Sequence, residues 1–181
     1  MEIRESIESD KPEINSIHIK AFGEEKGLEI VNLVNNLFEN KTAMPLLSLV
    51  ALEGGKVFGH ILFTTADVTQ TAETVSARIL APLAVLSDAQ NKDVGGQLIK
   101  EGLSQLKLSE VELVFVLGHP KYYPRFGFIP AGAQGYEAPY HIPEKHAGAW
   151  MVHELCAGVV GRVKGKVQCS EVLNQPEHWQ E

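Results

Sequence analysis

Apolar residues near the start of the chain recur at the spacing of two amphipathic helices. After a short strand expected at residues 2–7, Asp10, Pro12 and Glu13 form a helix-start signal, and the apolar positions that follow predict a first helix over about residues 11–22. Two glycines beyond it, Gly23 and Gly27, are expected to break this helix. Apolar residues then return at helical spacing and predict a second helix; they are Ile30, Val31, Val34, Leu37 and Phe38.

The pattern changes to that of strands after the second helix. Residues 46–52 and 56–67 are apolar, β-branched and aromatic runs, and Glu53-Gly54-Gly55 joins them. This composition predicts a tight antiparallel hairpin. Because Gly59 lies inside the second run, we expect a bulge or a close backbone approach there.

A third strand, expected at residues 73–85, continues the meander. A helix at residues 95–108 then leads to residues 111–117, an apolar run typical of a strand buried on both faces. Consecutive strands followed by a helix and another strand predict an α+β fold rather than a strictly alternating one. After a region rich in loop signals, residues 150–155 predict a further strand, and residues 161–167 predict a hairpin or an edge strand.

The stretch from Ile79 to Ile99 joins a strand, a polar turn and the start of a helix. The turn presents the first N–H groups of that helix, which lack partners inside the helix, beside Gly95 and Gly96. A helix N-terminus carries partial positive charge, and glycine lets a ligand approach the backbone, so the turn suits a phosphate group. It contains neither the Gly-x-x-x-x-Gly-Lys-Ser/Thr loop nor the three-glycine dinucleotide fingerprint.

Two motifs in this chain resemble the cofactor motifs of the GNAT superfamily of N-acetyltransferases. The pattern Gln90-x-x-Asp93-x-Gly95 is similar to the Arg/Gln-x-x-Gly-x-Gly/Ala loop that holds the pyrophosphate of acetyl-CoA, and Tyr123-Pro-Arg-Phe-Gly127-Phe128 resembles the Tyr-x-x-x-Gly-Phe signature. The sequence around both is closest to the YhbS-like subgroup. The resemblance implies a mixed central sheet, with antiparallel strands and then a parallel splayed pair, flanked by helices. It covers residues 1–155, and residues 156–181 are expected to form a C-terminal strand extension of the same domain.

The resemblance also implies roles for single residues. The main chain at Leu83, Ala84 and Val85 would hold the pantetheine arm of acetyl-CoA. Tyr123 would donate a proton to the coenzyme A sulfur, with Tyr122 as the competing candidate. The loop expected to bind the pyrophosphate comprises Gln90, Asn91, Lys92, Asp93, Val94, Gly95 and Gly96.

Pro82 interrupts a strand that should otherwise lie inside the sheet. Proline has no N–H to donate, so the ladder is expected to break on one side of this strand. An ordinary bulge is one explanation. In the GNAT pattern, this strand and the next begin parallel and then splay to leave a cleft, so we expect residues 82–85 to diverge from residues 115–117.

Asp93 departs from the family loop, which has glycine at this position. A carboxylate at a helix N-terminus is expected to cap the helix, and it competes with a bound anion. At about 4 Å and an effective dielectric constant of about 20, two like charges repel by roughly 4 kcal/mol. Lys92 is expected to offset part of this repulsion.

The leading hypothesis for the function is an N-acetyltransferase. A non-catalytic acyl-CoA-binding or regulatory domain is the alternative, and an interaction module that keeps only the fold is a third.

The composition of the chain limits the number of domains, the partners and the cellular location that we expect. With 181 residues, 44% of them hydrophobic, the chain is expected to form one globular domain. A net charge of −7 gives no basic surface for nucleic acid or an anionic membrane. The two cysteines, Cys156 and Cys169, form no metal motif and favour a reduced cytoplasmic protein without metal. No signal peptide or membrane-length apolar run is visible.

Direct acetyl transfer requires a neutral amine and a positioned thioester more than a nucleophilic side chain. The acceptor would be a small-molecule or protein amine, bound beside residues 20–28 and the loop at residues 131–149, and a homodimer stays open. No general base is chosen, because a water chain can also remove the proton. The candidates for a base are His60, Asp67, Glu73, His119 and Glu137.

Overall fold

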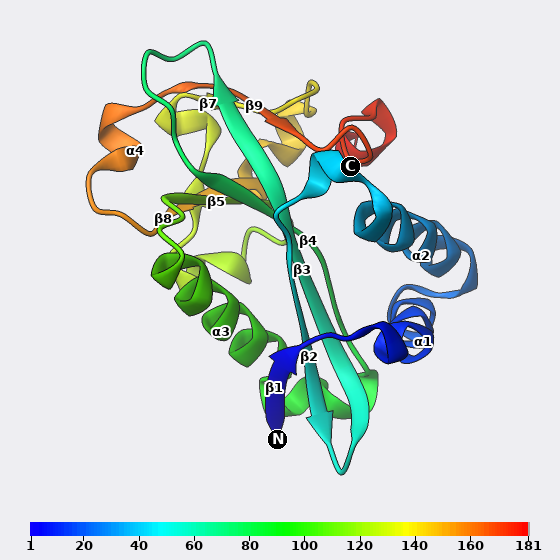
Figure 1. Ribbon diagram of the computed structural model, residues 1–181. Coiled ribbons are helices and arrows are strands. Elements are labelled where there is room, and N and C mark those ends of the chain that lie inside the picture. Colours follow the sequence, from blue (N-terminus) through cyan, green and yellow to red (C-terminus); the bar gives the residue numbers. More distant parts are fainter. Residues whose placement is uncertain (181) are drawn as a thin grey trace.

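The structure, a computed structural model, describes residues 1–89 and 92–180 in full and only the backbone of Gln90 and Asn91. Its strands form a mixed sheet in the order β1-β2-β3-β4-β5-β8-β6, with β9 joined to β3 and β7 (Figure 1). The strands are β1 (Glu2–Glu5), β2 (Leu47–Glu53), β3 (Lys56–Thr69), β4 (Ala77–Val85), β5 (Leu113–Leu117), β6 (Ile129–Pro130), β7 (Tyr136–Glu137), β8 (Trp150–Glu154) and β9 (Gly165–Cys169). The helices are α1 (Lys11–Phe22), α2 (Glu24–Glu39), α3 (Val94–Leu108) and α4 (Val159–Arg162).

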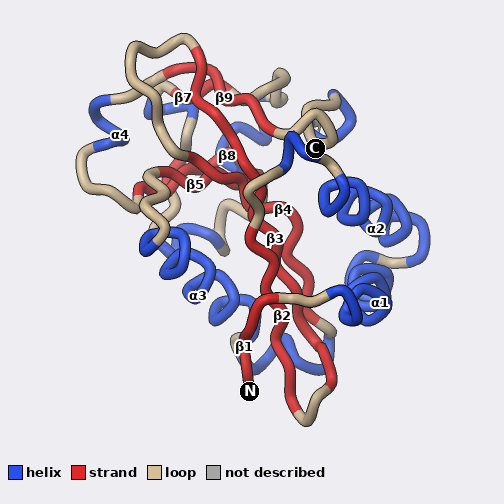
Figure 2. Tube along the Cα trace, viewed as in Figure 1, coloured by secondary structure: helices blue, strands red, loops and turns tan. Residues whose placement is uncertain are grey.

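Helices cover both faces of the sheet (Figures 1 and 2). Helices α1 and α2 pack on one face, and α3 packs on the other, as two separate hydrophobic clusters show. Strands β1 to β4 run antiparallel, whereas β4 and β5 run parallel. The predicted α+β fold with a mixed sheet is therefore confirmed, and so are the bounds of the first helix.

Gly27 does not end a helix, in contrast to the prediction. The break falls at Gly23, which has a φ of +88°, and α2 begins at Glu24. Gly27 lies inside α2 at its contact with α1, where an added Cβ would come within 2.6 Å of the Ile19 Cα. This glycine serves the close approach of two helices, a role that its local sequence does not reveal.

Gly59 marks an irregularity in the β2–β3 hairpin, as predicted. Ala51 pairs with Gly59 and Leu52 pairs with Val57, so one residue of β3 is left without a partner in the register. A Cβ at Gly59 would also meet the side chains of Val94 and Leu98 of α3. The bulge and the missing side chain together let α3 sit against the sheet.

The C-terminal segment belongs to the same packed structure. Of the hairpin or edge strand expected at residues 161–167, a strand forms: β9 follows α4 and pairs with both β3 and β7, so it is neither half of a hairpin nor an edge strand. Trp179 is only 2% exposed, its ring packs edge-on against Trp150 at 5.4 Å, and its Nε1 donates to the Leu173 carbonyl.

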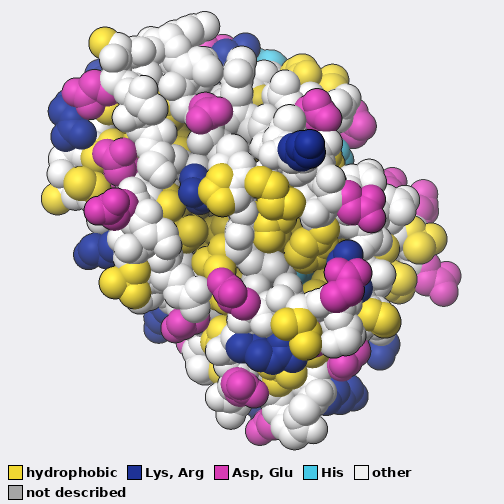
Figure 3. Space-filling model, in the orientation of Figure 1, with side chains coloured by type: hydrophobic (Ala, Val, Ile, Leu, Met, Phe, Trp, Pro, Cys, Tyr) yellow, Lys and Arg dark blue, Asp and Glu magenta, His cyan; other side chains and the backbone are white. Residues whose placement is uncertain are grey.

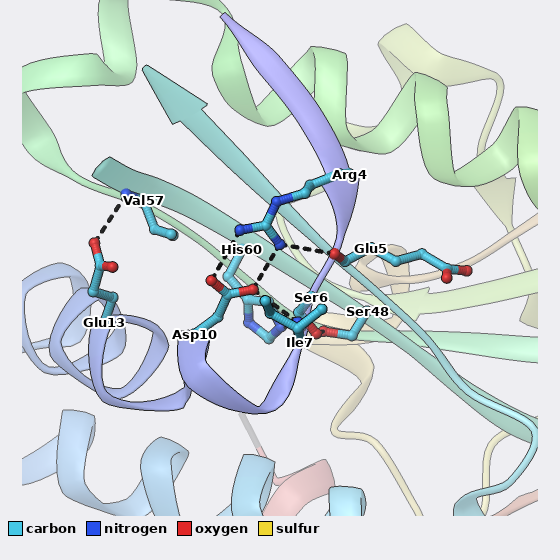
Figure 4. A network of polar contacts seen from close by, with 9 residues as sticks. All are labelled: Arg4, Glu5, Ser6, Ile7, Asp10, Glu13, Ser48, Val57 and His60. Atoms are coloured by element: carbon cyan, nitrogen blue, oxygen red, sulfur yellow. Dashed lines mark hydrogen bonds and ion pairs between the residues drawn. The ribbon is translucent and has the colours of Figure 1, made fainter. Parts of the chain in front are cut away.

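Buried histidines link α1 to the sheet through a chain of polar contacts. His18 Nε2 lies 2.9 Å from His60 Nδ1, and His60 Nε2 lies 2.9 Å from Ser48 Oγ. Figure 4 shows His60 and Ser48 beneath the first strand, next to the ion pair of Arg4 with Asp10. Neither histidine side chain is exposed to solvent.

The surface shows no concentration of one charge on the face drawn in Figure 3, where acidic and basic side chains are interspersed. Within the part of the chain that the structure describes, no helix is both long and apolar enough to cross a bilayer.

Candidate active site

Pairing between the parallel strands β4 and β5 stops partway along β4. Residues 77–80 pair with residues 113–116, and the ladder goes no further. On its other side, β4 stays paired with β3 as far as Val85, but the register shifts between Leu80 and Leu83, so the bulge considered at Pro82 is present as well. The predicted divergence is therefore confirmed. Within the described residues, β4 beyond Leu80 has a strand neighbour on one side only.

A cleft of 520 Å³ opens where the two strands diverge. Pro82 and Leu83 of β4 line one side, and Leu117 and the residues that follow β5 line the other. Because Pro82, Leu83 and Ala84 lie beyond the ladder with β5, the cleft can accept an extended chain with amide groups beside them. This cleft adjoins a larger groove of 970 Å³ along α2.

Three further segments complete the cleft. Phe22 and Lys26 come from the α1–α2 region, and His146 and Ala149 come from the loop before β8, so both regions that the sequence assigned to the acceptor side contribute. The C-terminal segment adds a wall that no motif indicated, which consists of Leu173, Glu177, His178 and Trp179.

The connection after β4 ends at the N-terminus of α3. The first backbone bond of the helix runs from the Gln97 N–H to the Asp93 carbonyl at 3.0 Å. The N–H groups of Val94, Gly95 and Gly96 therefore precede the helical ladder, and together with the helix dipole they form a suitable site for a phosphate group.

The side chains expected to assist this loop are only partly described. Those of Gln90 and Asn91 lie outside the described part of the structure. Lys92 is exposed, and its Nζ lies 3.7 Å from a Glu53 carboxylate oxygen. Its charge is thus directed toward Glu53, whereas the sequence suggested that it offsets Asp93.

Asp93 has a left-handed backbone, with φ +56° and ψ +33°. Glycine adopts this conformation freely and aspartate tolerates it, which accounts for the glycine in the family pattern. Asp93 occupies the N-cap position, but its side chain accepts no capping hydrogen bond, so the predicted side-chain cap is wrong. The carboxylate lies instead against the backbone of Gly96, where an added Cβ would collide with it. A carboxylate thus lies beside the N-terminal end of α3.

Tyr123 and Tyr122 point to different parts of the site. Tyr123 lines the cleft and is 8% exposed, and burial raises the pKa of its hydroxyl above the ordinary value. Tyr122 lies over the start of α3, where a Cβ on Gly95 would come within 2.7 Å of its hydroxyl oxygen. Burial, followed by the charge of Asp93, raises the pKa of Tyr122 as well. Of these two neighbours, Tyr123 faces the cleft and Tyr122 faces the loop.

The candidates for a general base also lie in different parts of the structure. His119 lines the cleft. His60 is buried in the polar chain to His18, and Glu73 pairs with Arg162 at 3.0 Å. Asp67 and Glu137 are exposed on β3 and β7, away from the lining of the cleft. Two lining histidines that the sequence did not indicate, His146 and His178, come from segments without a motif.

No group of three or more His, Cys, Asp or Glu side chains that could hold a metal ion occurs in the described residues. The site combines the N-terminus of a helix, a strand that extends beyond its parallel neighbour, the buried phenol of Tyr123 and a cleft with apolar lining. These are groups that can bind and orient a long, phosphate-bearing molecule.

Comparison with known proteins gives a consistent result. The family model described as "Acetyltransferase (GNAT) domain" matches residues 2–131. The N-acetyltransferase YjhQ of Escherichia coli (strain K12) is 44% identical over 164 residues, which cover 90% of this chain and 88% of YjhQ. The N-acetyltransferase YhbS of the same strain is 32% identical over 176 residues, which cover 97% of this chain and 99% of YhbS.

Two solved structures resemble the whole chain. The crystal structure of Escherichia coli YhbS in complex with CoA has a TM-score of 0.85 at 30% identity, and covers 96% of this chain and 92% of that one. A GNAT acetyltransferase from Brucella melitensis in complex with acetyl-CoA has a TM-score of 0.73 at 26% identity, and covers 95% of this chain and 97% of that one.

Proposed function

Because the chain belongs to the acetyltransferase (GNAT) domain family and is an acyltransferase, we propose that it moves the acetyl group of acetyl-CoA directly to the nitrogen of an amine. The observation that carries this proposal is the cleft where β4 leaves β5, with Tyr123 in its wall. It is supported by two relatives that align along nearly the whole chain and hold CoA or acetyl-CoA.

We propose that acetyl-CoA lies along β4. Its pantetheine amides bond to the main chain at Leu83, Ala84 and Val85, as the resemblance to the family implies; Leu83 itself lines the cleft. Its pyrophosphate meets the first N–H groups of α3, at Val94 and the glycines that follow. The motif also assigns residues 90–93 to this loop.

The chemistry that this arrangement suits is direct attack. The amine nitrogen forms a bond to the thioester carbonyl carbon, the carbon–sulfur bond breaks, and the sulfur leaves as a thiolate that takes up a proton. Tyr123 is the proposed donor, because burial keeps its hydroxyl protonated at neutral pH. Its raised pKa opposes early proton transfer, so the hydroxyl first donates a hydrogen bond to the developing thiolate and gives up its proton as the carbon–sulfur bond breaks. The proton of the amine leaves through water or through His119, which lines the same cleft.

We also propose that residues 1–155 form the transferase domain and that residues 156–181 extend it within the same unit. Pairing of β9 with β3 and burial of Trp179 support this assignment. The C-terminal segment is thereby part of the acceptor side.

One observation favours a second function. The carboxylate of Asp93 beside the anion-binding helix end weakens the site for a pyrophosphate, as expected of a domain that senses acyl-CoA without turning it over.

Calorimetric titration with acetyl-CoA, followed by a thiol-release assay with a panel of amines, separates the two functions. Binding with turnover supports the enzyme, and binding without turnover on any amine supports the sensor. If acetyl-CoA does not bind, both proposals are wrong.

A further inference from the structure

A groove runs along one side of α2 and adjoins the cleft. This α2 groove, of 970 Å³, lies between α2 and the C-terminal segment, which are neighbours in Figure 1. One end is bridged by the hydrogen bond from Asn40 Nδ2 to Glu171 Oε1 at 2.8 Å. The other end opens into the cleft, because Lys26, Leu33 and Glu177 line both spaces.

The two ends of this path differ in polarity. Where the path meets the cleft, Phe22, Ile30 and Leu33 present apolar surface. An apolar surrounding disfavours an ammonium ion, so an amine nitrogen held there loses its proton more readily and becomes nucleophilic. The reacting nitrogen is therefore best placed beside these three side chains.

The α2 groove beyond this point is polar and acidic. Among the residues that the structure describes, its lining contains four carboxylates and one lysine, and the Nζ of that lysine, Lys26, lies 3.7 Å from a Glu29 carboxylate oxygen. Amide side chains of α2 and the C-terminal segment lie among the carboxylates, and their oxygens can accept hydrogen bonds from N–H groups. The carboxylates belong to Glu29, Glu39, Glu171 and Glu177.

We propose that the acceptor is a linear aliphatic diamine or polyamine. One nitrogen reacts beside Phe22, Ile30 and Leu33, and a second, charged nitrogen stays in the α2 groove. The methylene chain between them lies on Leu33. Along α2, Glu29 is four residues and Glu39 six residues from Leu33, so the two nitrogens are separated by about 6 to 9 Å at a rise of about 1.5 Å per residue. This inference rests on the proposed function and specifies its acceptor.

The experiment compares diamines with monoamines of equal length on the full chain: putrescine, cadaverine and hexamethylenediamine against n-butylamine, n-pentylamine and n-hexylamine. With saturating acetyl-CoA, thiol release should show a kcat/KM about tenfold higher for each diamine, since the α2 groove offers several carboxylates to the second charge. The advantage should shrink as salt is added.

A paired variant tests the groove itself. The double substitution Glu29→Gln and Glu177→Gln should lower kcat/KM about tenfold for diamines and less than twofold for monoamines. The matched control, Glu101→Gln with Glu110→Gln, removes two exposed charges away from the groove and the cleft and should change the rate for neither substrate class.

Several results overturn the inference. They are equal rates for diamines and monoamines, an equal loss for both in the groove variant, or clear preference for a lysine-containing peptide over every diamine. If no amine is acetylated, calorimetry of hexamethylenediamine with the CoA-loaded protein decides, and absence of binding refutes the diamine assignment. A failure of acetyl-CoA binding refutes the proposed function instead.

Discussion

The buried pair of His18 and His60 should make the protein sensitive to mild acid. His18 is fully buried, and burial lowers its pKa from 6.5 to about 4. Burial, and then the neighbouring His18, lower the pKa of His60 well below its ordinary value, while Asp10 acts weakly in the other direction. Both rings are neutral in the folded protein at neutral pH.

The sign of the effect follows from which state takes up the proton. In the unfolded chain, His18 becomes protonated as pH falls through about 6.5, whereas in the folded protein it stays neutral until about 4. The unfolded state therefore binds more protons in this window, and the free energy of unfolding falls with falling pH. The full difference corresponds to about 3 kcal/mol for His18 below pH 4, and to about 2 kcal/mol at pH 5.

Urea unfolding at several pH values between about 7 and 4 measures this loss. The double substitution His18→Leu with His60→Leu should remove most of the pH dependence, because both titrating rings are gone. His141→Gln, at an exposed position, is the control and should retain it. In an NMR titration, the His18 ring should not titrate above about pH 5. A wild-type loss below about 1 kcal/mol, or an ordinary His18 titration near 6.5, would refute the reasoning.

Three substitutions test other parts of the structure. Tyr123→Phe should lower turnover about a hundredfold and leave acetyl-CoA affinity unchanged, whereas Tyr122→Phe should keep most of the activity; full turnover in Tyr123→Phe would exclude the phenol as donor. Asp93→Gly should tighten acetyl-CoA binding about fivefold at low salt, since it removes a carboxylate from the helix end and places glycine in a left-handed backbone conformation. Equal or weaker binding in calorimetry contradicts this. Gly27→Ala should destabilise the fold by about 1 to 2 kcal/mol in urea unfolding, because its Cβ meets the backbone of α1. Gly161→Ala is the control, since its Cβ enters open space in α4. Equal stability of both variants would disprove the packing argument.

The sequence by itself determined the class of fold and the place of the cleft. The α1 pattern, the β2–β3 hairpin and the Gly59 bulge are local features, because side-chain periodicity and turn residues act within a few positions. Pro82 also marked the irregular part of β4 correctly: the ladder to β5 ends at Leu80, and the register with β3 shifts between Leu80 and Leu83.

Only the tertiary structure decided how the site is closed. Gly27 was misread as a helix break because its role depends on α1, and the Asp93 side chain was misread as a cap because its orientation depends on a left-handed backbone. The C-terminal wall, the α2 groove and the His18–His60 contact join segments far apart along the chain. Such contacts form only when the sheet brings these segments together, so no periodicity or spacing in the sequence encodes them.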